Sequence, residues 1–217
     1  MIITRNMNEN TSMKRRRLSP EKRKSLILDH TADIIAADGV AVLSMELIGK
    51  KAGISKSLVY TYFDSLTELL RALLKRELKR LRRLQVQEAE NAQTFEELVR
   101  GVTHQYLKYI EERGLIIERL QAEPSVSRGH DPTDYSRNDA VSYISEIVAK
   151  NFDIPQGLAI AVTDISFGLP ATAGAFYLHS EMSREDIEKI TVTMILGSLN
   201  AVQNDYSTRQ QILRRKT

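Results

Sequence analysis

The segment from Ser44 to Phe63 constrains the fold of this chain more than any other part of the sequence. Ser44 and Ser55 both stand where a side-chain oxygen can cap a helix N-terminus. Gly53, between them, can adopt the positive φ that a sharp corner between two helices requires. The segment therefore predicts a helix-turn-helix, and its second helix, Ser55 to Phe63, is of the kind that enters a DNA major groove.

The side chains of this second helix divide into an inward and an outward set. Val59 and Phe63 fall on the inward face with Ile48, and we predict that they are core. The outward residues predicted to reach base edges, where a lysine can donate to guanine O6 and N7, are Lys56, Ser57 and Thr61. The residues predicted to bind phosphates, which fixes register without reading sequence, are Ser44, Ser55, Tyr60 and Tyr62.

The segment also resembles a known family. The residues that carry the resemblance are Ala52-Gly53-Ile54-Ser55, Leu58-Val59-Tyr60, Tyr62-Phe63 and Glu68-Leu69-Leu70, which are similar to the signature of the tetracycline-repressor (TetR) family. The resemblance covers roughly a quarter of the chain. It implies an all-α protein of about nine helices, in which a three-helix DNA-binding domain precedes a helical domain for effector binding and dimerisation. It also supports the division of DNA contacts given above.

Two residues depart from the family pattern. The family usually has alanine where this chain has Gly49, and lysine where it has Leu66. In the family, that lysine holds a DNA phosphate at the start of the fourth helix. The resemblance therefore implies the fold but not this particular phosphate contact.

Charge divides unevenly along the chain. Residues 1–66 hold 11 Lys/Arg and 7 Asp/Glu, whereas residues 67–217 hold 20 and 21. The excess positive charge therefore lies in the N-terminal part, which contains the helix predicted to enter the DNA groove, called the reader helix below. We expect residues 1–18, with their basic run Lys14 to Arg17, to be a flexible arm, residues 19–66 to be the DNA-binding domain and residues 67–217 to be the effector-binding and dimerisation domain. The arm is either a further DNA contact or a basic tail without a role.

Caps, glycines and apolar periodicity predict the remaining helices. The first runs from the cap Ser19 to Asp38 and the fourth from about Thr67 to Asn91. The later elements are expected at 95–113, 115–122, 138–151, 156–179 and 183–202, with the main loop at 124–137. Pro170 should kink the helix that contains it.

The last two helices look apolar over wider faces than one neighbouring pair would cover. Small residues in the first of them, such as Gly168 and Gly174, would let another backbone approach closely. The TetR resemblance implies that these two helices pair with their copies in a homodimer. The alternative is an ordinary buried hairpin.

The resemblance further implies a cavity for a small-molecule effector among helices four to eight. With few formal charges on the inner faces, a hydrophobic or amphipathic effector is expected. The candidate lining residues are His104, Tyr106, Tyr109, Arg113, Leu120, Tyr143, Ile147 and Phe167.

Few features of the sequence indicate an enzyme. It contains no Gly-rich phosphate loop, no zinc-protease motif and no paired histidines at metal-ligand spacing, so we expect no catalytic residue, no metal and no cofactor. It has no cysteine, and we find no apolar run that approaches the roughly 18 residues of a membrane span, so a cytoplasmic protein is expected.

We therefore predict a DNA-binding transcriptional regulator that binds a double-stranded operator as a homodimer and acts as a repressor released by its effector. The alternative is a ligand-independent DNA-binding protein whose C-terminal domain only dimerises or recruits a protein partner. An enzyme is a distant third reading.

Overall fold

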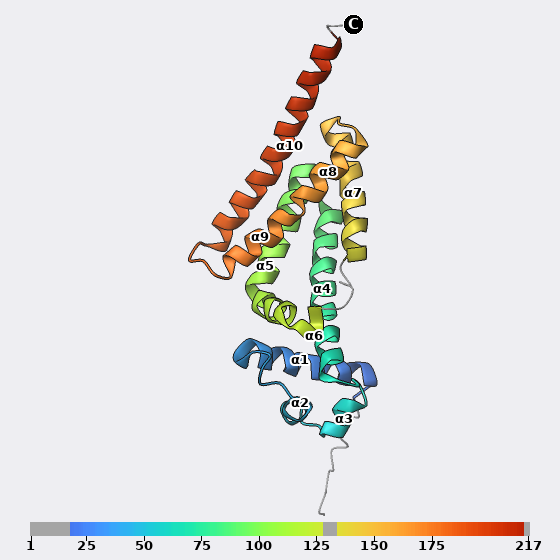
Figure 1. Cartoon of the computed structure of the whole chain (residues 1–217), viewed down its shortest axis with the longest axis vertical. Coiled ribbons are helices and arrows are strands. Elements are labelled where there is room, and N and C mark those ends of the chain that lie inside the picture. The colour runs from blue at the N-terminus through green and yellow to red at the C-terminus, as the bar shows by residue number, and fades with distance from the viewer. Residues whose placement is uncertain (1–17, 128–133, 215–217) are drawn as a thin grey trace, which may run out of the picture.

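A computed structural model describes residues 18–127 and 134–214 (Figure 1). The described residues form ten helices and no strand, so the all-α fold is confirmed. The helices are α1 (Pro20–Asp38), α2 (Met45–Ala52), α3 (Lys56–Tyr60), α4 (Leu66–Asn91), α5 (Phe95–Ala122), α6 (Pro124–Ser127), α7 (Asp134–Phe152), α8 (Gln156–Ser166), α9 (Gly168–Tyr177) and α10 (Arg184–Arg214). The predicted arm lies outside the described residues, apart from its last residue, Leu18.

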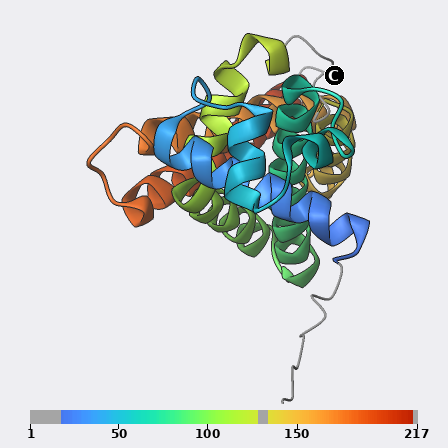
Figure 2. The same cartoon turned by 90° about the horizontal axis from the view of Figure 1, so that it is seen from below.

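The first three helices gather at one end of the molecule, and the C-terminal half of the chain extends away from them (Figure 1). Figure 2 views this end and shows α1, α2 and α3 in front of the longer helices. Helix α4 starts beside α3 and runs into the C-terminal half, where it packs along α5. A single helix therefore connects the two halves without a break.

Two hydrophobic cores stabilise the chain. The first joins residues of α1–α3, such as Ile35 and Ile48, to Leu73 of α4 and Leu120 of α5. The second lies at the other end of the molecule, among α5, α7, α8 and α10. Because the first core crosses the predicted boundary at residues 66 and 67, the reader helices pack directly against the C-terminal half.

The helix-turn-helix forms for the local reasons that the sequence indicates. Ser44 accepts a hydrogen bond from the Leu47 amide at 3.1 Å, and Ser55 accepts one from the Leu58 amide at 3.2 Å. Gly53 has φ 66° and ψ 31°, the left-handed conformation that closes α2. Both predicted caps and the predicted corner are confirmed.

The prediction that a helix ends before Gly114 is wrong. Helix α5 continues through this residue to Ala122. A Cβ at Gly114 would lie 3.1 Å from a methyl group of Leu178, which follows α9. Gly114 is therefore a place where α5 lets another segment approach closely, and not a helix terminator.

Three predicted boundaries in the C-terminal half also change. Helix α6 and the early start of α7 occupy much of the predicted loop at 124–137, of which residues 128–133 lie outside the description. Helix α10 continues to Arg214, twelve residues beyond the predicted end near Val202. The helix containing Pro170 is interrupted between α8 and α9, where proline cannot donate a backbone hydrogen bond to Ser166.

One segment passes a compositional test for a membrane span. Residues Gln156–Tyr177, which form α8 and α9, have a mean hydropathy of 1.4, and 22% of the tested window is buried. The expectation that no segment approaches such a run is therefore corrected. Length and composition alone are weak evidence for a span, because apolar helices of soluble proteins pass the same test.

Candidate nucleic-acid interface and effector cavity

The reader helix is shorter than predicted. Helix α3 ends at Tyr60, and the chain continues to Phe63 as a turn in which the amides of Tyr62 and Phe63 still donate to the Val59 carbonyl, at 3.0 and 3.1 Å. Val59 and Phe63 are buried with Ile48, so their predicted core role is confirmed. These buried residues fix the orientation of α3 and hold its other face outward.

The three predicted base-contacting side chains all lie on this exposed face. Lys56 extends beside Glu46 of α2, with 4.0 Å between Nζ and the carboxylate. The Ser57 hydroxyl lies 3.2 Å from that of Ser55, and the Thr61 hydroxyl donates to the Ser57 carbonyl at 3.2 Å. This ion pair is long and solvent-exposed, so breaking it would cost little if Lys56 bound a guanine.

The predicted phosphate-binding residues surround this face. Ser44, Ser55 and Tyr60 are exposed, whereas Tyr62 is half-buried and packs against the first core. The two serine oxygens already accept amide hydrogen bonds as caps. The Ser44 hydroxyl can still donate its hydrogen, whereas the Ser55 hydroxyl shares a contact with Ser57 in which either group can be the donor.

The two departures from the family signature have structural consequences. A Cβ at Gly49 would lie 3.0 Å from the Ile54 carbonyl oxygen and 3.3 Å from Val59, so glycine lets α2 and α3 cross closely. Leu66 is the first residue of α4 and packs partly buried against the first core. Its side chain carries no hydrogen-bond donor, so it offers nothing to a phosphate.

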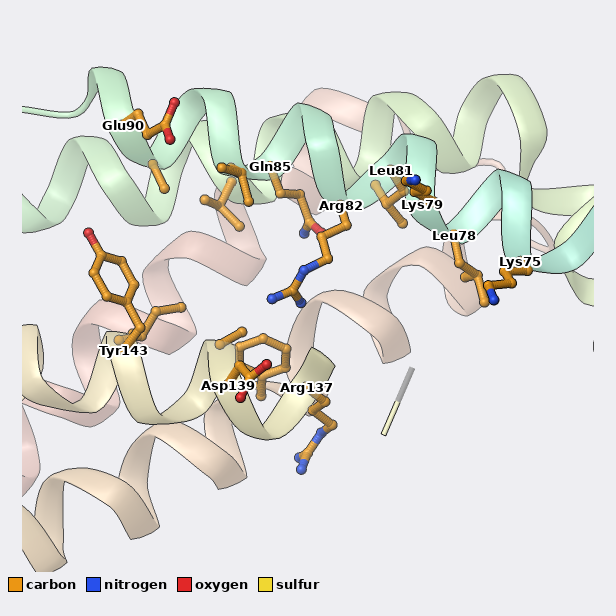
Figure 3. A pocket seen from close by; sticks show the side chains of 16 residues that line it. Lys75, Leu78, Lys79, Leu81, Arg82, Gln85, Glu90, Arg137, Asp139 and Tyr143 are labelled. Atoms are coloured by element: carbon orange, nitrogen blue, oxygen red, sulfur yellow. The ribbon is translucent and has the colours of Figure 1, made fainter. Parts of the chain in front are cut away.

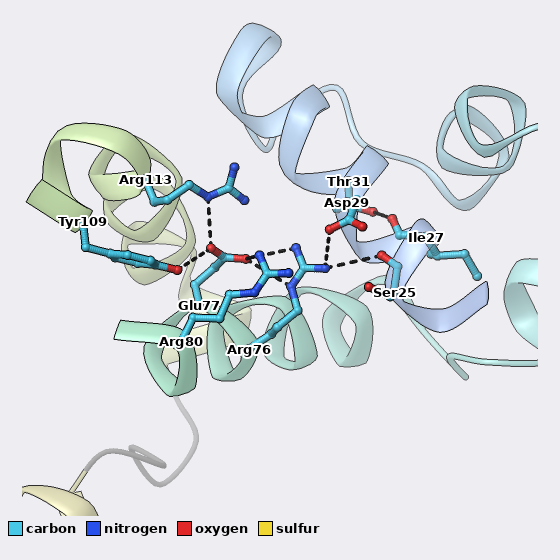
Figure 4. Close-up of polar contacts among 9 residues, drawn as sticks. All are labelled: Ser25, Ile27, Asp29, Thr31, Arg76, Glu77, Arg80, Tyr109 and Arg113. Atoms are coloured by element: carbon cyan, nitrogen blue, oxygen red, sulfur yellow. Dashed lines mark hydrogen bonds and ion pairs between the residues drawn. The ribbon is translucent and has the colours of Figure 1, made fainter. Parts of the chain in front are cut away.

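Behind the reader, a buried carboxylate ties three helices together (Figure 4). Glu77 of α4 is 0% exposed and accepts hydrogen bonds from the Tyr109 hydroxyl at 2.8 Å and from Arg113 Nε at 3.0 Å, both on α5. Arg76 pairs with the same carboxylate at 3.0 Å and also with Asp29 of α1 at 2.7 Å. This network connects the DNA-binding domain to both long helices.

Burial and ion pairing shift the pKa of Glu77 in opposite directions. Burial alone would raise the pKa of Glu77, but hydrogen bonds from Arg113 and Tyr109 and the charges of Arg113 and Arg76 outweigh it, so the pKa is lowered. Burial, followed by the hydrogen bond to Glu77, raises the pKa of Tyr109. Glu77 is therefore a stable anion among guanidinium groups.

An apolar cavity of about 330 Å³ lies within the C-terminal half. Its walls come from α4, α5, α7, α8, α9 and α10, and include Tyr106, Ile144, Thr163 and Phe167. Burial raises the pKa of Tyr106 to about 12, so this phenol stays protonated and can donate. The cavity has the size and lining of a small-molecule site.

A wider groove of about 820 Å³ adjoins this cavity and runs between α4 and α7 (Figure 3). The residues that line both spaces are Gln85, Val102, Arg137, Ile144 and Phe167. Arg137 stacks over the Phe167 ring at 5.6 Å and pairs with Asp164 at 2.6 Å. The shared walls place the groove at the mouth of the apolar cavity.

The eight candidate effector residues separate into two groups. Tyr106, Tyr143 and Phe167 line the cavity or the groove. The other five lie elsewhere: Tyr109 and Arg113 bind Glu77, His104 pairs with Glu188 at 3.0 Å, Leu120 belongs to the first core, and Ile147 is half-buried on α7.

Sequence reasoning missed Thr163, Gln85 and Arg137 as lining residues. The charged face of α4 also contributes Lys75 and Lys79 to the groove lining. Their spacing of four on one helix face was the available signal, but the facing helix α7 could not be placed from the sequence.

The buried Val59 and Phe63, together with the exposed face of α3, define a helix-turn-helix fold. Residues 27–73 match the family described as bacterial regulatory proteins, tetR family. This match assigns the DNA-binding domain of that family to residues 27–73 of the chain.

Solved structures support the fold over most of the chain. A TetR-family transcriptional regulator from Streptomyces coelicolor has a TM-score of 0.69 at 22% identity, covering 92% of this chain and 89% of that one. A TetR-like transcriptional regulator from Rhodococcus sp. RHA1 has a TM-score of 0.65 at 18% identity, covering 85% and 99%. No curated protein sequence matches the chain significantly.

Proposed function

We propose that the protein is a homodimeric transcriptional repressor that binds a double-stranded operator and is released from it by a small hydrophobic or amphipathic effector. The observation that carries the DNA-binding part is the exposed face of Lys56, Ser57 and Thr61, held outward by the buried Val59. Two such faces in a dimer would meet half-sites about 34 Å apart, or a multiple of that distance.

Dimerisation is supported by apolar side chains that the single chain leaves uncovered. Ile165 of α8 is 79% exposed, and Phe176 of α9 and Ile190 and Met194 of α10 are about half exposed. An added Cβ at Gly197, within α10, would meet nothing within 4 Å, so this glycine weakens the helix without serving any contact in the chain itself. A second copy packed on α8–α10 accounts for both features.

Release by an effector is supported by the position of α4. Its first turns contribute Leu69 and Leu70 to the core behind the reader, and its later turns line the groove with Arg82 and Gln85. An effector that prefers one position of α4 would change the spacing of the two readers. It can do so only by its differential affinity for the two states, so effector and operator weaken each other reciprocally.

The DNA-reading assignment predicts different outcomes for two substitutions. Lys56→Ala should cost about 1–3 kcal/mol on the preferred operator and little on other sequences, because a base contact is lost. Tyr60→Phe should weaken all sequences to a similar extent, because a phosphate donor is lost. Operator selection followed by competition binding with altered sites measures both effects.

The matched control is Lys108→Ala, which removes the same charge from an exposed position on α5. It should leave operator preference unchanged. If Lys56→Ala and Tyr60→Phe produce the same uniform loss, the assignment of a base contact to Lys56 is wrong. If the intact protein selects no operator at all, the repressor proposal fails.

A further inference from the structure

The groove between α4 and α7 is charged at one end. Lys75, Lys79 and Arg82 recur on one face of α4 at spacings of four and three residues, and all three line the groove. Figure 3 shows Arg82 pointing from α4 across the groove toward α7, with Lys75 and Lys79 on the same side of it along α4. Glu90 and Tyr143 lie together at the opposite end.

Among the described residues that line the groove, the cations are Lys75, Lys79, Arg82 and Arg137, and the acids are Glu90 and Asp139. Arg137 pairs with Asp164, and Arg82 has an interaction of its own, so the charges of both are partly compensated. Glu90 lies at the far end of the groove, and Asp139 lies on α7 opposite Arg82. The described charged side chains at the end formed by Lys75 and Lys79 are therefore cationic, which favours an anion there.

The adjoining cavity has the opposite character. Apolar side chains such as Val148, Ile195 and Leu199 form most of its wall, and none of the described residues that line it is acidic. The cavity wall therefore favours the apolar part of a ligand.

We propose that the effector is an amphipathic anion. Its carboxylate or phosphate group binds at Lys75 and Lys79, and its apolar body enters the cavity past Phe167. This assignment rests on the proposed function for the existence of an effector, and it adds the chemical class and the orientation. It also gives the charged face of α4 a role in binding a ligand.

The test is direct binding to the full-length protein without DNA, by calorimetry, with three probes that share a twelve-carbon chain. Dodecanoate and dodecyl phosphate should each bind at least about fivefold more tightly than uncharged dodecan-1-ol at low salt. The preference should shrink at high salt, because the binding end is open to solvent. Comparing the carboxylate with the phosphate identifies which head group the site prefers.

The variant Lys75→Gln/Lys79→Gln should reduce this preference to less than about twofold while leaving dodecan-1-ol binding unchanged. Both side chains are exposed, so the variant should fold. The matched control Arg83→Gln/Lys108→Gln removes two exposed charges that do not line the groove, and it should retain the preference.

The outcomes separate this inference from the proposed function. Equal binding of the anions and the alcohol, or no binding of any probe, overturns the ligand class even if an operator is found. Loss of the preference in the control variant also overturns it, because the preference would then depend on the net charge of the protein and not on the groove lysines. A clear anion preference that depends on Lys75 and Lys79 supports the ligand class even if no operator is selected.

Discussion

Glu77→Gln is expected to lower the free energy of unfolding by about 3–5 kcal/mol. The substitution removes the charge from a fully buried carboxylate that compensates Arg76 and Arg113 and accepts the Tyr109 hydroxyl. The guanidinium groups then remain close together without their anion. Chemical denaturation followed by circular dichroism measures the change. A loss below about 1 kcal/mol would show that water compensates these cations.

The same network predicts how stability depends on pH. The pKa of Glu77 is lower in the folded protein than in the unfolded chain, so its contribution is fully present above the unfolded value and is lost as pH falls through the folded value. The difference in stability between the natural protein and Glu77→Gln should therefore narrow on acidification. The control Glu96→Gln breaks an exposed pair with Arg100 and should change stability by only about 0–1 kcal/mol.

Ile165→Glu combined with Met194→Glu is expected to convert the protein to a folded monomer. Both side chains are exposed apolar groups, on α8 and α10, and a two-fold interface would bring four new carboxylates together without partners. Operator affinity should fall by at least about 100-fold, because the two readers are no longer linked. Light scattering at micromolar concentration and operator titration measure the two effects.

Val42→Glu is the control for added charge. Val42 is an exposed apolar residue between α1 and α2 and belongs to none of the helices α8–α10, so its substitution should leave the dimer intact. Should the double variant remain dimeric, the interface lies elsewhere on the molecule. Unchanged helical content and a single cooperative unfolding transition are needed to show that the monomer is folded.

The parts of the fold that could be predicted depend on local chemistry. Ser44, Gly53 and Ser55 act through hydrogen bonds and backbone angles within a few residues, so their types and spacing were sufficient. Gly114 shows the limit of this reasoning, because its role depends on Leu178, far away in sequence. A glycine that ends a helix and one that admits a neighbour look the same in a single sequence.

The candidate cavity was harder to predict for a related reason. Tyr109 and Arg113 lie on the inner face of α5 as expected, but Glu77 binds them both. The available signal was an acidic residue at a core position of α4, three and four residues after the buried Leu74 and Leu73. Which charges compensate it could be seen only with α4 and α5 side by side.

The core shared by α1–α3, α4 and α5 limits how this protein can be divided. A fragment ending near residue 66 would lose the covering that Leu69, Leu73 and Leu120 give to its apolar side chains. A chimera that transplants the DNA reader onto another regulatory module therefore needs its junction beyond Leu81, together with the half of α5 that carries Tyr109 to Leu120. The smallest transferable unit is thus discontinuous in sequence, and exchange between such regulators should favour grafting surface residues of α3 over swapping whole segments.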